Sequence, residues 1–336
     1  MTTTPQVRQP APALPTSRGP VSEAVLVALR TGQMARPRLE GTDPLGDDLQ
    51  LALYCCYEVH YRGFADVDDV REWDPDLLAL RADLETEFLR ALHEHVAPGT
   101  DVDAEVNRLL VESTEPAGAS HHLRRDGELW QLREYVAQRS LYHLKEADPQ
   151  TFVIPRLHGQ AKAALVTVQH DEYGAGEASR MHSLLFATTM RELGLSDVYG
   201  AYLDTAPAEA LAEVNFMSLC GLHRTLRAAL VGQFASIELT SSPGADRLVK
   251  AMRRFGCSSE AIHFYAEHVE ADAVHEQLVR HKVLGPMLDA EPELAADVVF
   301  GIRASGWLAS RLERRMLRSW QRGESSMHAG HSAEQP

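Results

Sequence analysis

Apolar residues recur every three or four positions along most of this sequence. The pattern is clear over residues 77–96, 103–114 and 128–148, where it places the apolar side chains on one face of an α-helix. Residues 204–242 are a nearly continuous apolar run, long enough for two helices or one kinked helix, and they predict the buried central element. No useful length alternates like a β-strand, and no repeat of about 20–50 residues is present. The sequence therefore predicts a helical protein.

Length and charge limit the classes of protein that this chain can belong to. The 336 residues are enough for one large domain or two ordinary ones, and 44% of them are hydrophobic. The chain has 33 Lys and Arg against 48 Asp and Glu, a net charge of −15, which excludes nucleic acid as the main partner. No apolar run approaches the ~20 residues of a membrane span, and the N-terminus lacks the layout of a secretory signal. We therefore expect a cytoplasmic protein with neither membrane nor nucleic acid as a partner.

The composition changes at both ends of the chain. Residues 1–20 are rich in Pro and Thr without a periodic apolar face, which predicts a disordered N-terminal tail. Residues 21–322 carry the helical pattern and are predicted to form a single domain. Residues 323–336 are polar and predict a disordered C-terminal tail, so His328 and His331 are not assigned to a site.

The four cysteines are few for a chain of this length. Their spacing and their neighbours do not resemble a zinc knuckle. They are interpreted as core thiols in a reducing compartment, and the adjacent pair lies in an apolar helical run. These residues are Cys55, Cys56, Cys220 and Cys257.

Several other residues are assigned to the protein interior and not to a site. Glu58 and His60 are two positions apart, so they lie on different faces of a helix and cannot easily share one metal. Glu58 is interpreted as a buried, paired acid or a surface residue. Glu238 lies within the central apolar run and is interpreted as a hydrogen-bonded core acid. Three phenylalanines, Phe186, Phe216 and Phe264, are interpreted as ordinary core residues.

Residues 264–277, FYAEHVEADAVHEQ, have the residue types of a metal-binding helix. His268, Asp272 and His275 are spaced i, i+4 and i+7, so they share one helical face. Two imidazoles and a carboxylate with open coordination positions suit non-haem ferrous iron. The alternative is a solvated helix face that contains two histidines by chance.

A second set of residues lies upstream of this helix. Glu146 in YHLKEADP is followed 26 positions later by Glu172 in HDEYGAG, and ten positions after that by His182 in SRMHSLLF. Together with H-x-x-x-D-x-x-H in the late helix, this pattern resembles the haem-oxygenase-like di-iron oxidases and oxygenases, often described as iron-containing redox enzymes. The resemblance extends from roughly Glu128 to Gln277.

The resemblance implies an all-α fold like that of haem oxygenase, but without haem. It implies two non-haem iron ions, with O2 as co-substrate. One iron would take Glu146, His182 and a share of Glu172, and the other would take the three residues of the late helix and the rest of Glu172. The implied ligands are Glu146, Glu172, His182, His268, Asp272 and His275. An N-terminal extension through about Leu45 and the tail after Gly323 depart from the family pattern, which leaves a homodimer and other partner contacts open.

The resemblance also implies an oxidoreductase that acts on a small organic molecule, such as a fatty acid or an amino acid. Three alternatives are kept. The same ligands could serve a metal-storage or metal-sensing protein without an organic substrate. The chain could be a structural helical bundle whose acids and histidines lie on the surface. It could also be a mono-iron enzyme or a haem-binding protein.

Overall fold

The computed structural model describes residues 11–111 and 118–329, and none of these residues forms a β-strand. The all-α prediction is confirmed. In the same residues, no helix is both long enough and apolar enough to cross a membrane. The helices are α1 (Pro20–Thr31), α2 (Asp47–Glu58), α3 (Pro75–His95), α4 (Val102–Leu110), α5 (Ala119–Arg125), α6 (Leu129–His143), α7 (Asp148–Thr151), α8 (Gly159–Glu172), α9 (His182–Glu192), α10 (Ala208–Leu222), α11 (Arg227–Glu238), α12 (Ser241–Arg254), α13 (Ser259–Leu278), α14 (Gly285–Ala290) and α15 (Ala295–Trp320).

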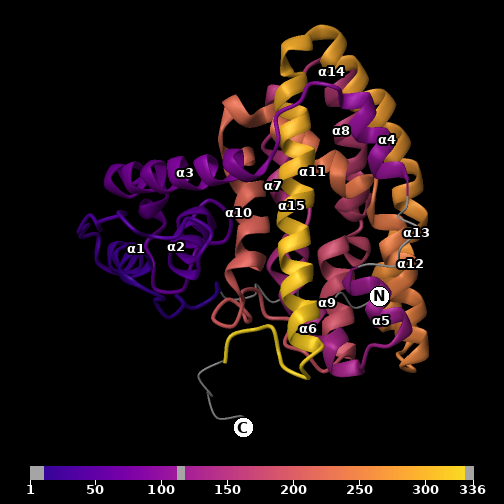
Figure 1. The fold of residues 1–336 in the computed structure, drawn as a ribbon, viewed down its shortest axis with the longest axis horizontal. Coiled ribbons are helices and arrows are strands. Elements are labelled where there is room, and N and C mark those ends of the chain that lie inside the picture. Colours follow the sequence, from indigo (N-terminus) through magenta and orange to yellow (C-terminus); the bar gives the residue numbers. More distant parts are fainter. Residues whose placement is uncertain (1–10, 112–117, 330–336) are drawn as a thin grey trace.

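The long helix α15 runs along the bundle, in the foreground of Figure 1, and packs against α11 and α10. Nearly every residue of α10 and α11 is buried. The run 204–242 is thus a buried central element made of two helices, as predicted. At the crossing, a Cβ on Gly232 would lie 2.2 Å from the carbonyl oxygen of Val298, and one on Gly301 would lie 2.1 Å from that of Ala229. The absence of both Cβ atoms lets the two backbones touch.

Replacing Gly301 with alanine is expected to lower the free energy of unfolding by about 1–3 kcal/mol, because the new methyl group overlaps a backbone carbonyl that cannot move alone. Gly306→Ala is the matched control on the same helix, since a Cβ there meets nothing within 4 Å. It should stabilise the helix by about 0.5–1 kcal/mol. Denaturant unfolding of both variants measures the contrast, and equal effects would contradict close backbone packing at the crossing.

Helices α1, α2 and α3 lie on one side of the bundle beside α10 (Figure 1). The residue before α1, Gly19, has no side chain to cap the helix. Instead the carboxylate of Asp48, at the start of α2, accepts hydrogen bonds from the backbone N–H groups of Val21 (3.0 Å) and Ser22 (2.7 Å). A carboxylate at this position satisfies free N–H groups and complements the positive end of the helix dipole.

The N-terminal tail prediction is wrong for residues 11–19. The backbone N–H of Ala65 donates to the carbonyl of Pro12 at 2.7 Å, and Arg18 donates to the carbonyl of Leu203 at 2.8 Å. These contacts are made by backbone groups and by the Arg18 side chain. They therefore produce no periodic pattern of apolar residues in the sequence. Residues 1–10 lie outside the described part of the chain.

The C-terminal tail prediction is likewise wrong for residues 323–329. Ser326 is 1% exposed, and its hydroxyl donates to the buried carboxylate of Glu134 at 2.5 Å. His328 donates its backbone N–H to Thr205 and places its ring 2.8 Å from Asp47. Polar hydrogen bonds attach this segment to the bundle. Residues 330–336, and with them His331, are outside the described residues.

All four cysteines carry free thiols. Cys55, Cys56 and Cys220 are buried, as predicted for core thiols, and Cys257 is half-buried. Burial raises the pKa of Cys56 to about 12, so this thiol keeps its proton at neutral pH.

Candidate metal centre

The six predicted ligands lie together in the bundle, and each is at most 9% exposed. Four elements bring them there: the turn after α6 carries Glu146, α8 ends at Glu172, α9 begins at His182, and α13 carries the other three. The positions scattered over the sequence from 146 to 275 therefore converge on one buried region.

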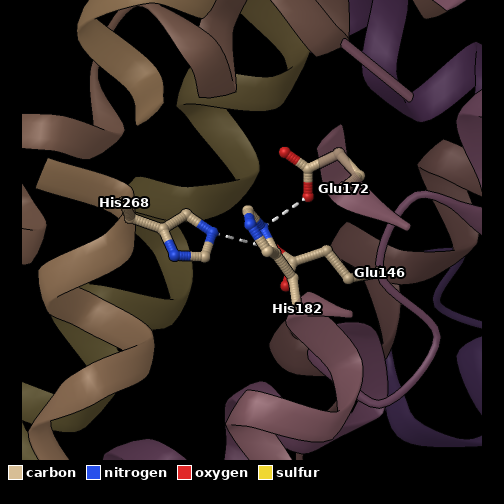
Figure 2. A group of neighbouring side chains, drawn as sticks. All are labelled: Glu146, Glu172, His182 and His268. Atoms are coloured by element: carbon tan, nitrogen blue, oxygen red, sulfur yellow. Dashed lines mark ion pairs between the residues drawn. The ribbon is translucent and has the colours of Figure 1, made fainter. Parts of the chain in front are cut away.

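One group of side chains combines Glu146, Glu172, His182 and His268. Each can present a ligand atom so that these atoms all lie within 4.8 Å of one another. Figure 2 shows the four side chains pointing toward one another. Nδ1 of His182 lies 2.7 Å from Oε2 of Glu172, and Nε2 of His268 lies 3.7 Å from Oε1 of Glu146.

A second group combines Glu172, Glu238 and His275, again with ligand atoms within 4.8 Å. Nδ1 of His275 lies 3.1 Å from Oε2 of Glu238 and 3.6 Å from Oε1 of Glu172. Glu172 thus presents one carboxylate oxygen to each group. This is the arrangement that a carboxylate needs in order to bridge two metal ions.

The division of ligands differs from the predicted one. His268 belongs with Glu146 and His182, whereas it was predicted to share an ion with Asp272 and His275. Helix α13 rises about 10 Å between positions 268 and 275, so a single helical face supplies both groups. Oδ2 of Asp272 accepts a hydrogen bond from the Ser241 hydroxyl at 2.5 Å, and Oδ1 lies 3.7 Å from His275. Metal ligation by the six residues stays a prediction.

Glu238 is the candidate ligand that sequence reasoning missed. It is buried and hydrogen-bonded to His275, as predicted for a core acid, but it also belongs to the second group. The signal is its place at the end of α11, where the helix dipole disfavours a carboxylate. Glu172 ends α8 and Glu146 follows the end of α6, so the three acids share this unfavourable position. A bound cation would offset it.

The loop between α8 and α9 brings Glu172 and His182 together. Gly174 has φ +71, in the left-handed region, and a Cβ there would lie 2.6 Å from the backbone nitrogen of Met181. Only glycine allows this corner to close so tightly.

Carboxylates and imidazoles in the centre shift one another's pKa. Burial alone would lower the pKa of His268 and His275. The Glu146 carboxylate raises the pKa of His268 by more than burial lowers it, and Asp272 and Glu238 do the same for His275. The pKa values rise to about 10 and about 11. Burial, Glu172 and Asp272 raise the pKa of Glu238 to about 7, although His275 opposes the shift. Protonated imidazoles thus balance the carboxylates of the metal-free protein.

The residues of the centre fit two divalent cations. Four buried carboxylates carry a formal charge that two such ions would neutralise: Glu146, Glu172, Glu238 and Asp272. Two buried ligand atoms, Oε2 of Glu146 and Nδ1 of His182, make no hydrogen bond of suitable geometry to any described residue. Imidazole and carboxylate with open positions suit non-haem iron.

Metal uptake by the metal-free protein is expected to release protons and to tighten between pH 6 and pH 8. The reason is that His268 and His275, with pKa values of about 10 and 11, must lose a proton before they can bind a metal. Calorimetric titration with Zn²⁺ in buffers of different ionisation enthalpy counts these protons. Uptake without proton release would contradict ligation by the two imidazoles.

A buried ion pair lies next to the centre. Lys145, adjacent to Glu146, is 1% exposed, and its Nζ lies 2.9 Å from Oε2 of Glu58. The Tyr199 hydroxyl, 2.8 Å from both Glu58 oxygens, donates to this carboxylate, and Arg62 donates to the carbonyl of Leu144 at 2.7 Å. Glu58 is the buried, paired acid that the sequence allowed. Together these contacts fix the turn that carries Glu146.

A cavity of 270 Å³ lies beside the centre, between α6, α10, α11 and α15. Tyr142, Ile237 and Ser241 line both this cavity and the small space among the candidate ligands. Phe216, predicted as core, is buried and also forms part of the cavity wall. Phe186 and Phe264 are buried, and their rings pack against His143 at centroid distances of 4.7 and 5.1 Å.

Comparisons with known proteins agree with this geometry. Residues 133–309 match the family model described as iron-containing redox enzyme, a range that contains every residue of both groups. The chain is also 26% identical over 174 residues to a nitrosourea synthase from Streptomyces achromogenes subsp. streptozoticus. That match covers 51% of this chain and 36% of the relative, so the chain spans only about a third of its length. The matched range includes more than half of the chain, and the protein belongs to the haem-oxygenase-like family of iron-containing redox enzymes.

Proposed function

We propose that this protein is a non-haem di-iron oxidase or oxygenase that uses O2 to oxidise a small organic molecule. The observation that carries the proposal is the pair of buried ligand groups that share Glu172. The adjoining cavity provides space for an organic substrate next to them. We expect the protein to act in the cytoplasm, with neither nucleic acid nor membrane as a partner.

The protein's own residues would hold and orient the ions. Glu172 would bridge them, with Glu146, His182 and His268 on one side and Glu238, Asp272 and His275 on the other. Two ferrous ions at these positions would supply electrons for the reduction of O2.

Neighbouring side chains would orient the ligands and keep water out. Nδ1 of His143 lies 2.8 Å from Oε1 of Glu146, and Ser241 donates to Asp272. Such contacts fix ligand geometry and tune affinity. Burial raises the pKa of Tyr142 well above its ordinary value, so this tyrosine, which lines the cavity, stays protonated.

Anaerobic titration with ferrous iron, followed by mixing with O2 in a stopped-flow spectrometer, tests the proposal. We expect two equivalents of iron to bind and a transient visible absorption to follow. His275→Ala should abolish O2-dependent turnover while the fold is kept. A fully active His275→Ala protein would overturn the proposal, and absence of iron uptake would favour a structural bundle.

A metal-storage or metal-sensing protein is the second candidate, because the same ligand groups would serve it. The cavity favours an enzyme, since storage needs no space for an organic molecule. A compound that accelerates decay of the absorption formed with O2 would support the enzyme. One equivalent of iron would indicate a mono-iron protein, and a haem spectrum after purification would indicate a haem-binding protein.

A further inference from the structure

Two histidines of α13 face the carboxylates of the centre with different ring nitrogens. Nε2 of His268 lies 3.7 Å from Oε1 of Glu146, while its Nδ1 lies 2.8 Å from the backbone carbonyl of Phe264. In His275 it is Nδ1 that lies 3.1 Å from Oε2 of Glu238. An imidazole that binds a metal keeps one proton, and the partner of the protonated nitrogen decides which nitrogen is free for the metal. A carbonyl accepts and never donates, so Nε2 is the free nitrogen of His268.

Asp171 contacts the other nitrogen of His275. Nε2 of His275 lies 3.4 Å from Oδ2 of Asp171, the residue before Glu172 at the end of α8. An ionised carboxylate accepts hydrogen bonds and cannot donate them, so the ring donates from Nε2. His275 is 1% exposed, whereas the side chain of Asp171 is 45% exposed. A partly exposed acid therefore holds a buried ring from the side opposite to Glu238.

Adjacent residues of α8 thus approach both nitrogens of one ring. Oε1 of Glu172 lies 3.6 Å from Nδ1 of His275, opposite to the contact that Asp171 makes with Nε2. Successive residues of an α-helix point about 100° apart, so the end of one helix can present both carboxylates. Nδ1 of His170 lies 3.7 Å from Oδ1 of Asp171, beyond hydrogen-bond distance, and does not occupy the oxygen that faces His275. The position of the ring is therefore tied to the helical turn that carries the candidate bridging carboxylate.

We propose that Asp171 is a positioning residue of the centre, which holds the Nε2–H group of His275 and so directs Nδ1 toward a metal ion beside Glu238. Asp171 is not a ligand in this assignment and acts only through His275. A carboxylate on the second nitrogen of a ligating imidazole fixes the orientation of the ring and makes it a better ligand. The carbonyl of Phe264 has the same place at His268. This inference rests on the proposed function, because it requires a metal ion at the second group.

Asp171→Ala is expected to weaken the binding of one ion only, roughly tenfold to a hundredfold, the usual effect of losing such a partner. The probe is Co²⁺ without O2, and calorimetric titration measures its affinity. In the Glu146→Ala background the second group stays complete, and there Asp171→Ala should have its full effect. In the Glu238→Ala background the first group stays complete, and there it should have little effect. No weakening in the first background, or equal weakening in both, would overturn the proposal.

Asp171→Asn separates the hydrogen bond from the charge. The amide oxygen of asparagine can accept from Nε2 of His275 in the same place, although the negative charge is lost. This variant should keep most of the Co²⁺ affinity. Binding as weak as in Asp171→Ala would assign the effect to charge and contradict a positioning role. Glu177→Ala removes an exposed acid in the loop after α8, and it should leave both affinities unchanged.

Proton NMR of the Co²⁺-loaded protein provides a readout besides affinity. A ring bound through Nδ1 carries its proton on Nε2, and the paramagnetic ion moves this exchangeable signal away from those of the rest of the protein. Its exchange with water should be roughly tenfold faster in Asp171→Ala than in the parent protein, the usual effect of one lost charge-assisted hydrogen bond. Asp171→Asn should restore slow exchange. Equal exchange rates in the parent protein and in Asp171→Ala would contradict the assignment.

The Co²⁺ measurements separate this inference from the proposed function, because they require no turnover. Iron stoichiometry and O2 consumption are measured on the same preparations. Two bound irons and O2 consumption, with no effect of Asp171→Ala on either Co²⁺ affinity, would refute the positioning role alone. The expected effects on Co²⁺ binding without O2 consumption by the iron-loaded protein would refute the oxidase proposal and keep the positioning role.

Discussion

Replacing Glu172 with alanine is expected to remove iron from both candidate sites and to abolish O2-dependent oxidation. Oε2 of Glu172 lies 2.7 Å from His182, and Oε1 lies 3.6 Å from His275, so each group loses a ligand when this side chain is removed. Loss of a residue that only supports a ligand weakens metal binding roughly tenfold to a hundredfold, and loss of a shared ligand should exceed that at both ions. Anaerobic ferrous titration with counting of bound iron measures the effect.

Variants of the unshared acids provide the comparison. Glu146 belongs to one group and Glu238 to the other, so alanine at either position should weaken one iron and leave the second. Glu177→Ala is the control in the loop after α8, because this acid is exposed and outside both groups. If Glu172→Ala keeps two tightly bound irons, the bridging role is wrong. If Glu238→Ala binds iron like the parent protein, the seventh candidate ligand is wrong.

Sequence reasoning could identify the helices and the six candidate ligands because both leave local patterns. The ligands of α13 share one helical face, and Glu146, Glu172 and His182 follow a spacing characteristic of the family. Glu238 has no such spacing, since it meets His275 only through the packing of α11 against α13. The predicted division of ligands differs from the two side-chain groups for a similar reason. A spacing along one helix does not say which residues of other helices face each turn.

The terminal segments and Asp171 show a second limit of sequence patterns. Residues 11–19 and 323–329 attach to the bundle through hydrogen bonds, such as those from Arg18 to Leu203 and from Ser326 to Glu134. Apolar periodicity cannot report such contacts. Asp171 likewise looks like an ordinary acid at the end of an amphipathic helix, and only the fold places it against His275.

Glu58→Gln is expected to lower the free energy of unfolding by about 3–5 kcal/mol, because it leaves the Lys145 ammonium buried without a counter-charge. Nζ of Lys145 lies 4.2 Å from the ring centroid of Tyr61 and 4.9 Å from that of Tyr54, contacts that compensate only in part for a lost carboxylate. Denaturant unfolding of the metal-free protein measures this change. Iron titration of the folded variant should also show weaker binding at the group containing Glu146, the residue next to Lys145.

A second substitution separates the charge effect from a loss of packing. Glu58→Gln/Lys145→Met removes both members of the pair, and replacing a buried ion pair by uncharged groups of similar size is often nearly neutral. The double variant should therefore regain most of the stability, while Glu94→Gln, a change at an exposed acid, should have little effect throughout. Recovered stability with iron binding still weakened would mean that the ion pair also positions Glu146. Equal destabilisation of the single and double variants would instead attribute the loss to packing around Glu58 and contradict the predicted charge effect.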